Sequence, residues 1–155
     1  MKTLSRLILL IVGIGIVGPA IAAGDPNEYA IDARQSVMSL QSWYAGTLFG
    51  MAKGDIPYDA ERASAAAANL KAAVEMDGSG MWPEGTDNSG AYKGNTRALP
   101  EGWSEYDAKY HDALVKSTND MAAAAGNGID ALRANIEALG DSCSGCHDAY
   151  RSEDF

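Results

Sequence analysis

Two cysteines and a histidine near the end of the chain have the types and spacing to hold a metal cofactor. They form a C-x-x-C-H pattern at Cys143, Cys146 and His147. On a helix, residues three apart share a face, and His147 lies one turn from Cys143. The two thiols can add to the vinyl groups of a haem while the histidine ligates the iron, and this pattern is the attachment sequence of a c-type haem. The motif predicts one covalent haem c, with His147 as an axial ligand.

Paired cysteines also serve other chemistries. A redox dithiol belongs at the start of a helix in a βαβ unit, and no strand pattern precedes this pair. Structural zinc needs four ligands, and His111 is the only other histidine. A thiol-redox or metal-binding module, or a plain disulfide, stays open as an alternative that would show no haem absorption. Only eight residues follow His147, and none is Met, so any sixth iron ligand comes from upstream.

The N-terminal segment has the pattern of an export signal. Lys2 and Arg6 precede an apolar run over residues 7–17, and residues 20–22 form a small-x-small cleavage site. The run is short for a bilayer span, which needs about 20 apolar residues. We therefore expect residues 1–22 to be a signal peptide rather than a membrane anchor. Because haem is attached to c-type cytochromes after export, the expected localisation is periplasmic.

The remaining domain, residues 23–155, is strongly acidic. It is about 133 residues long and carries ten basic and 21 acidic side chains, a formal charge of −11. Phosphate binding needs a basic surface, so nucleic acid is not expected as a partner, and an anionic membrane surface would repel the domain. A basic redox partner and a solvated surface that serves solubility are both compatible with this charge.

The domain reads as four helices with no strand. Asp25 is placed to cap the first helix, Pro26 fits its first position, and Glu28 completes a capping box. One long loop, rich in Gly, Pro, Asn and Thr, separates the second and third helices. Two short connections and one long one predict an all-α, antiparallel four-helix bundle. The expected helices cover about 26–53, 58–76, 104–125 and 129 onward, with the loop over 77–102.

Apolar spacing indicates which helix faces point inward. The first helix has the series Ile31, Arg34, Met38, Gln41, Ala45, Leu48 and Ala52. The last has Ile129, Leu132, Ile136, Leu139, Cys143, Cys146 and Tyr150. The haem would therefore hang on the core side of the last helix. Arg34 on an apolar seam needs an anion, which a haem propionate would supply, unless it lies at the edge and reaches solvent.

Several sequence elements, in order, resemble those of a known family. The chain is similar to the cytochrome c′ family, the four-helix class II c-type cytochromes of bacterial periplasms, and the resemblance covers the whole mature chain. Residue 102 is a Gly where the family usually has an aliphatic residue. The elements are residues 34–38, 52–54, 56–59, 82–86, 96–103 and 143–151.

The resemblance implies roles for five further residues. Met38 would cover the distal face of the haem, and Arg34 and Gln35 would contact its edge and propionates. Arg151 matches a basic residue near the proximal imidazole. Arg97, or its neighbour Thr96, would also reach the haem.

The resemblance also implies a function. With His147 as the one axial ligand, the iron would be five-coordinate and high-spin, and would bind NO or CO in an apolar distal pocket. The protein would be an electron-transfer and gas-binding protein rather than an enzyme, and a homodimer through its first two helices. The alternative within the fold is a low-spin, six-coordinate electron carrier with Met38 on the iron. Trp82 and Trp103 are expected to anchor the long loop.

Overall fold

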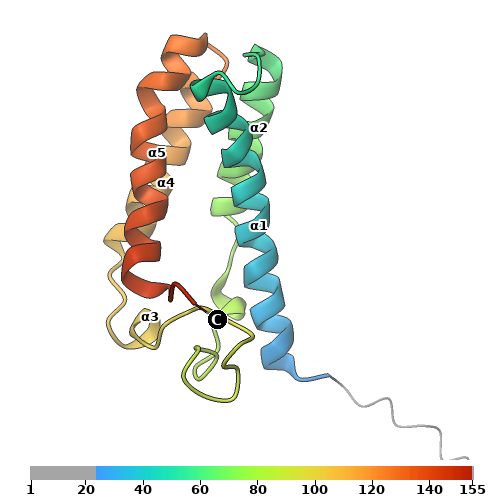
Figure 1. The fold of residues 1–155 in the computed structure, drawn as a ribbon, viewed down its shortest axis with the longest axis vertical. Helices are drawn as coiled ribbons and strands as arrows, with labels where there is room; N and C mark the ends of the chain where they lie inside the picture. The colour runs from blue at the N-terminus through green and yellow to red at the C-terminus, as the bar shows by residue number, and fades with distance from the viewer. Residues whose placement is uncertain (1–23, 155) are drawn as a thin grey trace, which may run out of the picture.

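The computed structural model describes residues 24–154, so the expected signal peptide lies outside the described residues. Four long helices form the predicted antiparallel bundle, and in Figure 1 α1 stands beside α2 and α4 beside α5. Between residues 24 and 154 there is no strand, only two isolated bridges. The elements are α1 (Pro26–Lys53), α2 (Ala60–Val74), the 3₁₀ turn η1 (Ser79–Met81), α3 (Glu101–Ser104), α4 (Lys109–Ala124) and α5 (Ile129–Tyr150).

The ends of α1 follow the local signals in the sequence. The side chain of Asp25 accepts a hydrogen bond of 2.9 Å from the backbone N–H of Asn27, and Pro26 occupies the first turn. At the other end Gly54 adopts a left-handed conformation with φ of 85° and donates to the carbonyls of Gly50 and Met51. A residue with a Cβ would be strained there, which explains why the helix ends at this glycine.

Two predicted boundaries were wrong by a few residues. The second helix was expected from residue 58, but Asp59 caps it and accepts from the N–H of Arg62 at 2.7 Å. The third was expected from about residue 104, but α4 begins only at Lys109. The backbone N–H of Asp107 donates instead to the hydroxyl of Tyr150 at 3.0 Å. A tertiary contact thus connects the segment between α3 and α4 to the end of α5.

The core lies among α1, α2, α4 and α5. Small side chains of α2, including Ala63 and Ala67, are buried and let the helices approach closely. The largest fully buried apolar side chains are Ile31, Leu48, Met51, Leu70, Met121, Leu132 and Leu139.

The predicted inward face of α1 holds only in part. Ile31, Arg34 and Leu48 are buried, but Met38 is 41% exposed, and Met51 rather than Ala52 is fully buried. Ala45 and Leu48, further along the same series, are buried again, so the exposed part of this face lies in the middle of α1.

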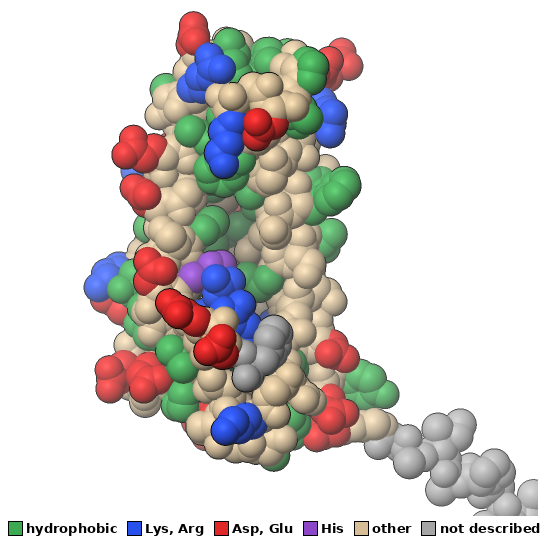
Figure 2. Space-filling model, in the orientation of Figure 1, with side chains coloured by type: hydrophobic (Ala, Val, Ile, Leu, Met, Phe, Trp, Pro, Cys, Tyr) green, Lys and Arg blue, Asp and Glu red, His purple; other side chains and the backbone are tan. Residues whose placement is uncertain are grey.

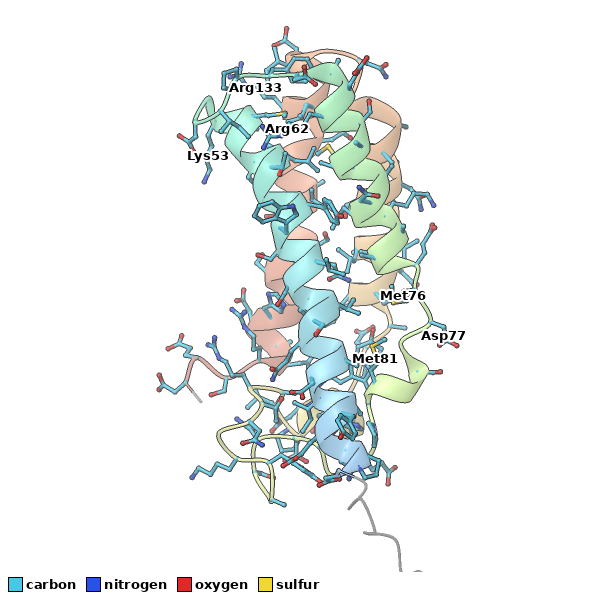
Figure 3. All side chains as sticks on the ribbon, turned by 90° about the vertical axis from the view of Figure 1, so that its right-hand side faces the viewer. Lys53, Arg62, Met76, Asp77, Met81 and Arg133 are labelled. Carbon is cyan, nitrogen blue, oxygen red and sulfur yellow. The ribbon has the colours of Figure 1, made fainter. Side chains whose placement is uncertain are left out.

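Polar contacts tie the bundle at the end where α1 stops and α2 starts. Tyr58 accepts a hydrogen bond from the N–H of Gly128 and donates to the carbonyl of Ala125, both at 2.9 Å. Arg133 of α5 donates through Nε to the carbonyl of Ala52 at 2.8 Å. Figure 3 shows Arg133 at this end of the bundle, and Met81 of η1 towards the opposite end.

Candidate haem-binding site

The three residues of the attachment motif lie on the last turns of α5. Cys143, Cys146 and His147 are all half-buried, and both cysteines are free thiols. Burial raises the pKa of each thiol. Burial also lowers the pKa of His147, and the positive charge of Arg151 lowers it further. The imidazole is therefore held in the neutral form, which is the form that ligates a metal.

A groove runs between α1 and α5. In Figure 2 hydrophobic side chains form its floor, and a histidine lies at its lower end beside Lys or Arg side chains and neighbouring Asp and Glu side chains. Two thiols one turn apart, a neutral imidazole, an apolar groove and basic side chains at one end are what a haem with two propionates requires. The residues present fit a haem attached at Cys143 and Cys146.

Arg34 lies in α1 and holds the long loop. Its side chain is 3% exposed. Nη1 donates to Oγ1 of Thr86 at 2.8 Å, and Nη2 donates to Oγ1 of Thr96 at 2.8 Å and to the carbonyl of Thr86. Both threonines are buried. Burial lowers the pKa of Arg34, and the nearby carboxylate of Asp87 opposes that shift. The guanidinium is thus charged, buried and held by neutral acceptors.

Two tryptophans pack on the same guanidinium. The centroid of the Trp82 ring lies 4.8 Å from Cζ of Arg34, and that of Trp103 lies 5.5 Å away. The two rings meet edge to face at 5.7 Å, and Nε1 of Trp103 donates to the carbonyl of Trp82 at 3.0 Å. Their predicted role as anchors of the loop agrees with these contacts. Cation–π attraction adds to the hydrogen bonds that fix the loop on α1.

The other side of the loop is fixed to the end of α5. Leu99 donates to the carbonyl of Tyr150 at 2.9 Å, and Ser152 donates to the carbonyl of Arg97 at 2.8 Å. Nε of Arg97 donates to the carbonyl of Ser152 at 2.7 Å, and its Nη2 donates to that of Glu153. The loop therefore connects α1 to the helix that carries the motif, and it brings the charge of Arg97 within range of His147.

The remaining predicted site residues lie near the two places where the loop is fixed, at Arg34 on α1 and at the end of α5. Gln35 is exposed and donates through Nε2 to the carbonyl of Asn95 in the loop at 2.7 Å. Arg151 is exposed and follows α5 directly. Met38 borders a shallow surface groove with Trp43 of α1 and Arg62 of α2. The structure thus gathers Arg97 and Arg151 with the motif, while Arg34 and Gln35 bind the loop.

Sequence reasoning missed two features of this region. Thr86 and Thr96 provide the buried acceptors for Arg34, although no local pattern distinguishes them from other loop threonines. Tyr106 and Tyr110 pack on Tyr150 beside the motif. Tyr150 belongs to the predicted inward-facing series of the last helix, but no sequence pattern indicated that it would contact Tyr106 and Tyr110.

The alternative uses of the cysteine pair find little support here. Over residues 24–154 the chain has no strand for a βαβ redox unit. Within the same range, no three His, Cys, Asp or Glu side chains gather into a metal-binding group. His111, in the first turn of α4, is exposed, as predicted. A structural zinc site would need more ligands than this part of the molecule brings together.

A family model described as cytochrome C′ matches residues 29–151, nearly all of the described chain. The chain belongs to the cytochrome c′ family. Cytochromes c′ are among the standard examples of the four-helix bundle, which agrees with the arrangement of α1, α2, α4 and α5. The family is one of haem proteins. Its match confirms both the resemblance and the four-helix fold that were inferred from the sequence.

Curated relatives support the assignment over most of the chain. Cytochrome c-554 of Cereibacter sphaeroides is 35% identical over 129 residues, which cover 82% of this chain and 83% of the relative. Cytochrome c′ of Halomonas halodenitrificans is 33% identical over 131 residues, covering 81% and 98%.

Solved structures of the family share the fold. Cytochrome c′ from Rhodobacter sphaeroides superposes with a TM-score of 0.78 at 31% identity, covering 82% of this chain and 98% of that one. A carbon monoxide-bound variant from Alcaligenes xylosoxidans gives a TM-score of 0.69 at 32% identity, with 84% and 98% covered. A nitrosyl complex of another variant from that organism gives 0.69 at 31%, with 84% and 99% covered.

No helix within residues 24–154 of this cytochrome c′ family member has the length and apolar character needed to cross a bilayer.

Proposed function

We propose that this protein is a periplasmic class II c-type cytochrome with one covalent haem c, a five-coordinate, high-spin iron and no enzymatic reaction of its own. It transfers electrons and binds NO or CO. The observation that carries the proposal is the position of Cys143, Cys146 and His147 on one half-buried stretch of α5 beside an apolar groove, in a chain of the cytochrome c′ family. The haem, when bound, supplies the redox couple and the gas-binding iron.

The chain's own residues prepare the proximal side. Burial and the charges of Arg151 and Arg97 disfavour protonation of His147, so its ring nitrogen is available to the iron. The carbonyl of His147 accepts from the N–H of Arg151 at 3.0 Å, which fixes the end of α5. The thioethers at Cys143 and Cys146 would hold the porphyrin against the same helix. We assign the propionate end to Arg97 and Gln35, next to Arg34, whose Nη1 and Nη2 atoms hold the loop there.

We place the open side of the iron next to Met38 of α1. Met38 is 41% exposed rather than packed in the core. The relatives solved with carbon monoxide and with a nitrosyl group show that family members take these gases. Met38 is the side chain we place nearest the distal face.

Absorption spectra of the purified ferric, ferrous and CO-treated protein test the proposal. We expect a high-spin ferric spectrum that changes on adding CO to the ferrous form, and loss of the native spectrum in His147→Ala. A low-spin ferric spectrum with a methionine–iron charge-transfer band would establish the six-coordinate alternative with Met38 as second ligand. A preparation with no Soret band, despite expression with haem-attachment machinery, would point to the thiol-redox or metal-binding alternative.

The proposal includes a homodimer and an exported chain. Exposed apolar side chains on α1, among them Leu40 and the 71% exposed Trp43, suit a contact with a second copy through α1 and α2. Light scattering of the unaltered protein and of Trp43→Glu tests this contact, and a monomeric unaltered protein would contradict it.

The proposed export is tested by the mass of the protein recovered from the periplasm, which should correspond to cleavage after residue 22. The acidic domain is compatible with a basic redox partner and equally with a surface that serves solubility.

A further inference from the structure

Three tyrosine rings pack together at the C-terminal end of α5. The ring of Tyr150, the last residue of α5, lies 5.8 Å from that of Tyr106 and 5.5 Å from that of Tyr110, measured between centroids. Tyr106 lies between α3 and α4, and Tyr110 lies in the first turn of α4. In Figure 1 this connecting segment passes beside the end of α5. Three separate parts of the chain thus build one tyrosine cluster.

The tyrosine cluster adjoins the attachment motif. Tyr150 follows Cys146 by four residues, so the two share a helix face. Tyr106 lies near enough to Cys146 for the two side chains to interact electrostatically. The ring of Tyr110 packs on α5 at Gly145, where an added Cβ would lie 3.4 Å from its Cε1. The tyrosine cluster therefore lies beside the turn of α5 that carries Cys146, with Tyr150 in ring contact with both other tyrosines.

The phenols differ in their contact with water. The hydroxyl of Tyr150 accepts from the N–H of Asp107 and donates to the carbonyl of Glu105, both at 3.0 Å. Tyr106 is 50% exposed. A phenol that loses one electron becomes a strong acid and must release its proton. Tyr106 can release it to solvent, whereas the proton of Tyr150 is held on a carbonyl that is a poor base.

We propose that Tyr106 is an oxidation site of the haem-loaded protein, at which hydrogen peroxide generates a tyrosyl radical that cross-links two molecules. Tyr150 is the ring between Tyr106 and the helix face that carries Cys146. The proposal rests on the covalent haem of the proposed function, because the bound haem supplies the route by which peroxide accepts electrons from tyrosine. It assigns the cluster a protective role, in which oxidising equivalents leave the haem pocket for the surface.

The chemistry balances with peroxide as the only oxidant. One H₂O₂ takes up two electrons and two protons and becomes two waters. Each of two protein molecules gives one electron and one proton from its Tyr106 phenol, which leaves two phenoxyl radicals. The radicals join through a carbon–carbon bond between ring positions ortho to oxygen, and the hydrogens at those positions move to the oxygens. Two phenols and one peroxide thus give one dityrosine and two waters.

Peroxide treatment of the haem-loaded protein tests the proposal. The measurements are electron paramagnetic resonance of freeze-quenched samples, dityrosine fluorescence, and peptide mass mapping of the covalent dimer. We expect a tyrosyl signal and a cross-link between two peptides that contain Tyr106. Tyr106→Phe keeps the ring and removes the hydroxyl, and should lose the cross-link while keeping the haem spectrum. Tyr29→Phe is the matched control, because Tyr29 is 64% exposed but lies in the first turn of α1.

Each outcome decides for or against the assignment. Mapping of the unaltered dimer to any residue other than Tyr106 would overturn it, and this measurement does not depend on a variant that folds. Cross-linking that persists in Tyr106→Phe, or that is lost in Tyr29→Phe, would do the same. A normal haem spectrum with no radical and no cross-link would refute the inference and leave the proposed function standing. Absence of the haem spectrum before peroxide is added would instead refute the proposed function.

Discussion

Nη2 of Arg34 in α1 donates a hydrogen bond of 2.8 Å to Oγ1 of Thr96, across 62 residues of sequence. The residue after Thr96 is Arg97, which donates to the carbonyl of Ser152 beyond the end of α5. Two adjacent loop residues therefore connect the first helix of the bundle to the helix that carries the attachment motif. This connection holds the two walls of the groove at a fixed distance near the expected propionate end.

Removing the hydroxyl of Thr96 should destabilise the protein. In Thr96→Val, both Arg34 and the backbone N–H of Ala98, which donates to the same oxygen at 3.1 Å, lose an acceptor. A buried donor left without a partner costs about 1–3 kcal/mol. Thr47→Val is the control, because the Thr47 hydroxyl donates at 3.3 Å to the carbonyl of Trp43 in its own helix. It should change stability by only about 0.5 kcal/mol. Denaturant unfolding of both variants gives the comparison, and equal effects would show that the Arg34 contact adds nothing.

The tie at the opposite end of the bundle predicts a second stability effect. Tyr58→Phe leaves the N–H of Gly128 and the carbonyl of Ala125 without their partner, so unfolding free energy should fall by about 1–3 kcal/mol. Tyr44 is half-buried against the same core, and its hydroxyl makes no hydrogen bond within the described chain. Tyr44→Phe should therefore be nearly neutral, and a similar loss in both variants would contradict the role of the Tyr58 hydroxyl.

The attachment motif predicts the behaviour of the cofactor under denaturation. The unaltered polypeptide should carry the mass of one haem and keep it through acid–acetone extraction, because thioether bonds survive unfolding. The double variant Cys143→Ala with Cys146→Ala should yield polypeptide without covalent haem. Intact mass spectrometry of both proteins measures this. Haem that extracts freely from the unaltered protein would show that the cysteines do not bind it covalently.

Met38 predicts a kinetic effect on gas binding. Met38→Ala removes the side chain placed nearest the distal face, so CO should bind the ferrous protein faster. Because Met38 is 41% exposed, its loss should cost less than the roughly 2–5 kcal/mol of a buried Met→Ala change. Flash-photolysis rebinding of CO, with unfolding midpoints measured alongside, checks both expectations. Unchanged rebinding in a folded variant would mean that another residue covers the iron.

The sequence alone determined the features that depend on a few neighbouring residues. Asp25, Pro26 and Gly54 set the ends of α1 through backbone hydrogen bonds and φ preferences that act within one turn. The spacing of Cys143, Cys146 and His147 predicted a haem because its chemistry is contained in five consecutive residues. The long loop between two pairs of helices was equally evident from its composition and its lack of helical period.

The tertiary structure decided what depends on distant partners. Arg34 was expected to meet an anion, but its nearest acceptors are Thr86 and Thr96, 52 and 62 residues away. At the late start of α4, the N–H of Lys109 donates locally to Oδ1 of Asp107 at 2.9 Å, while the N–H of Asp107 donates to the distant hydroxyl of Tyr150. The periodicity of a helix specifies a face but not the element that covers it. Long-range hydrogen bonds and ring contacts arise only when the packing of the bundle brings separate segments together.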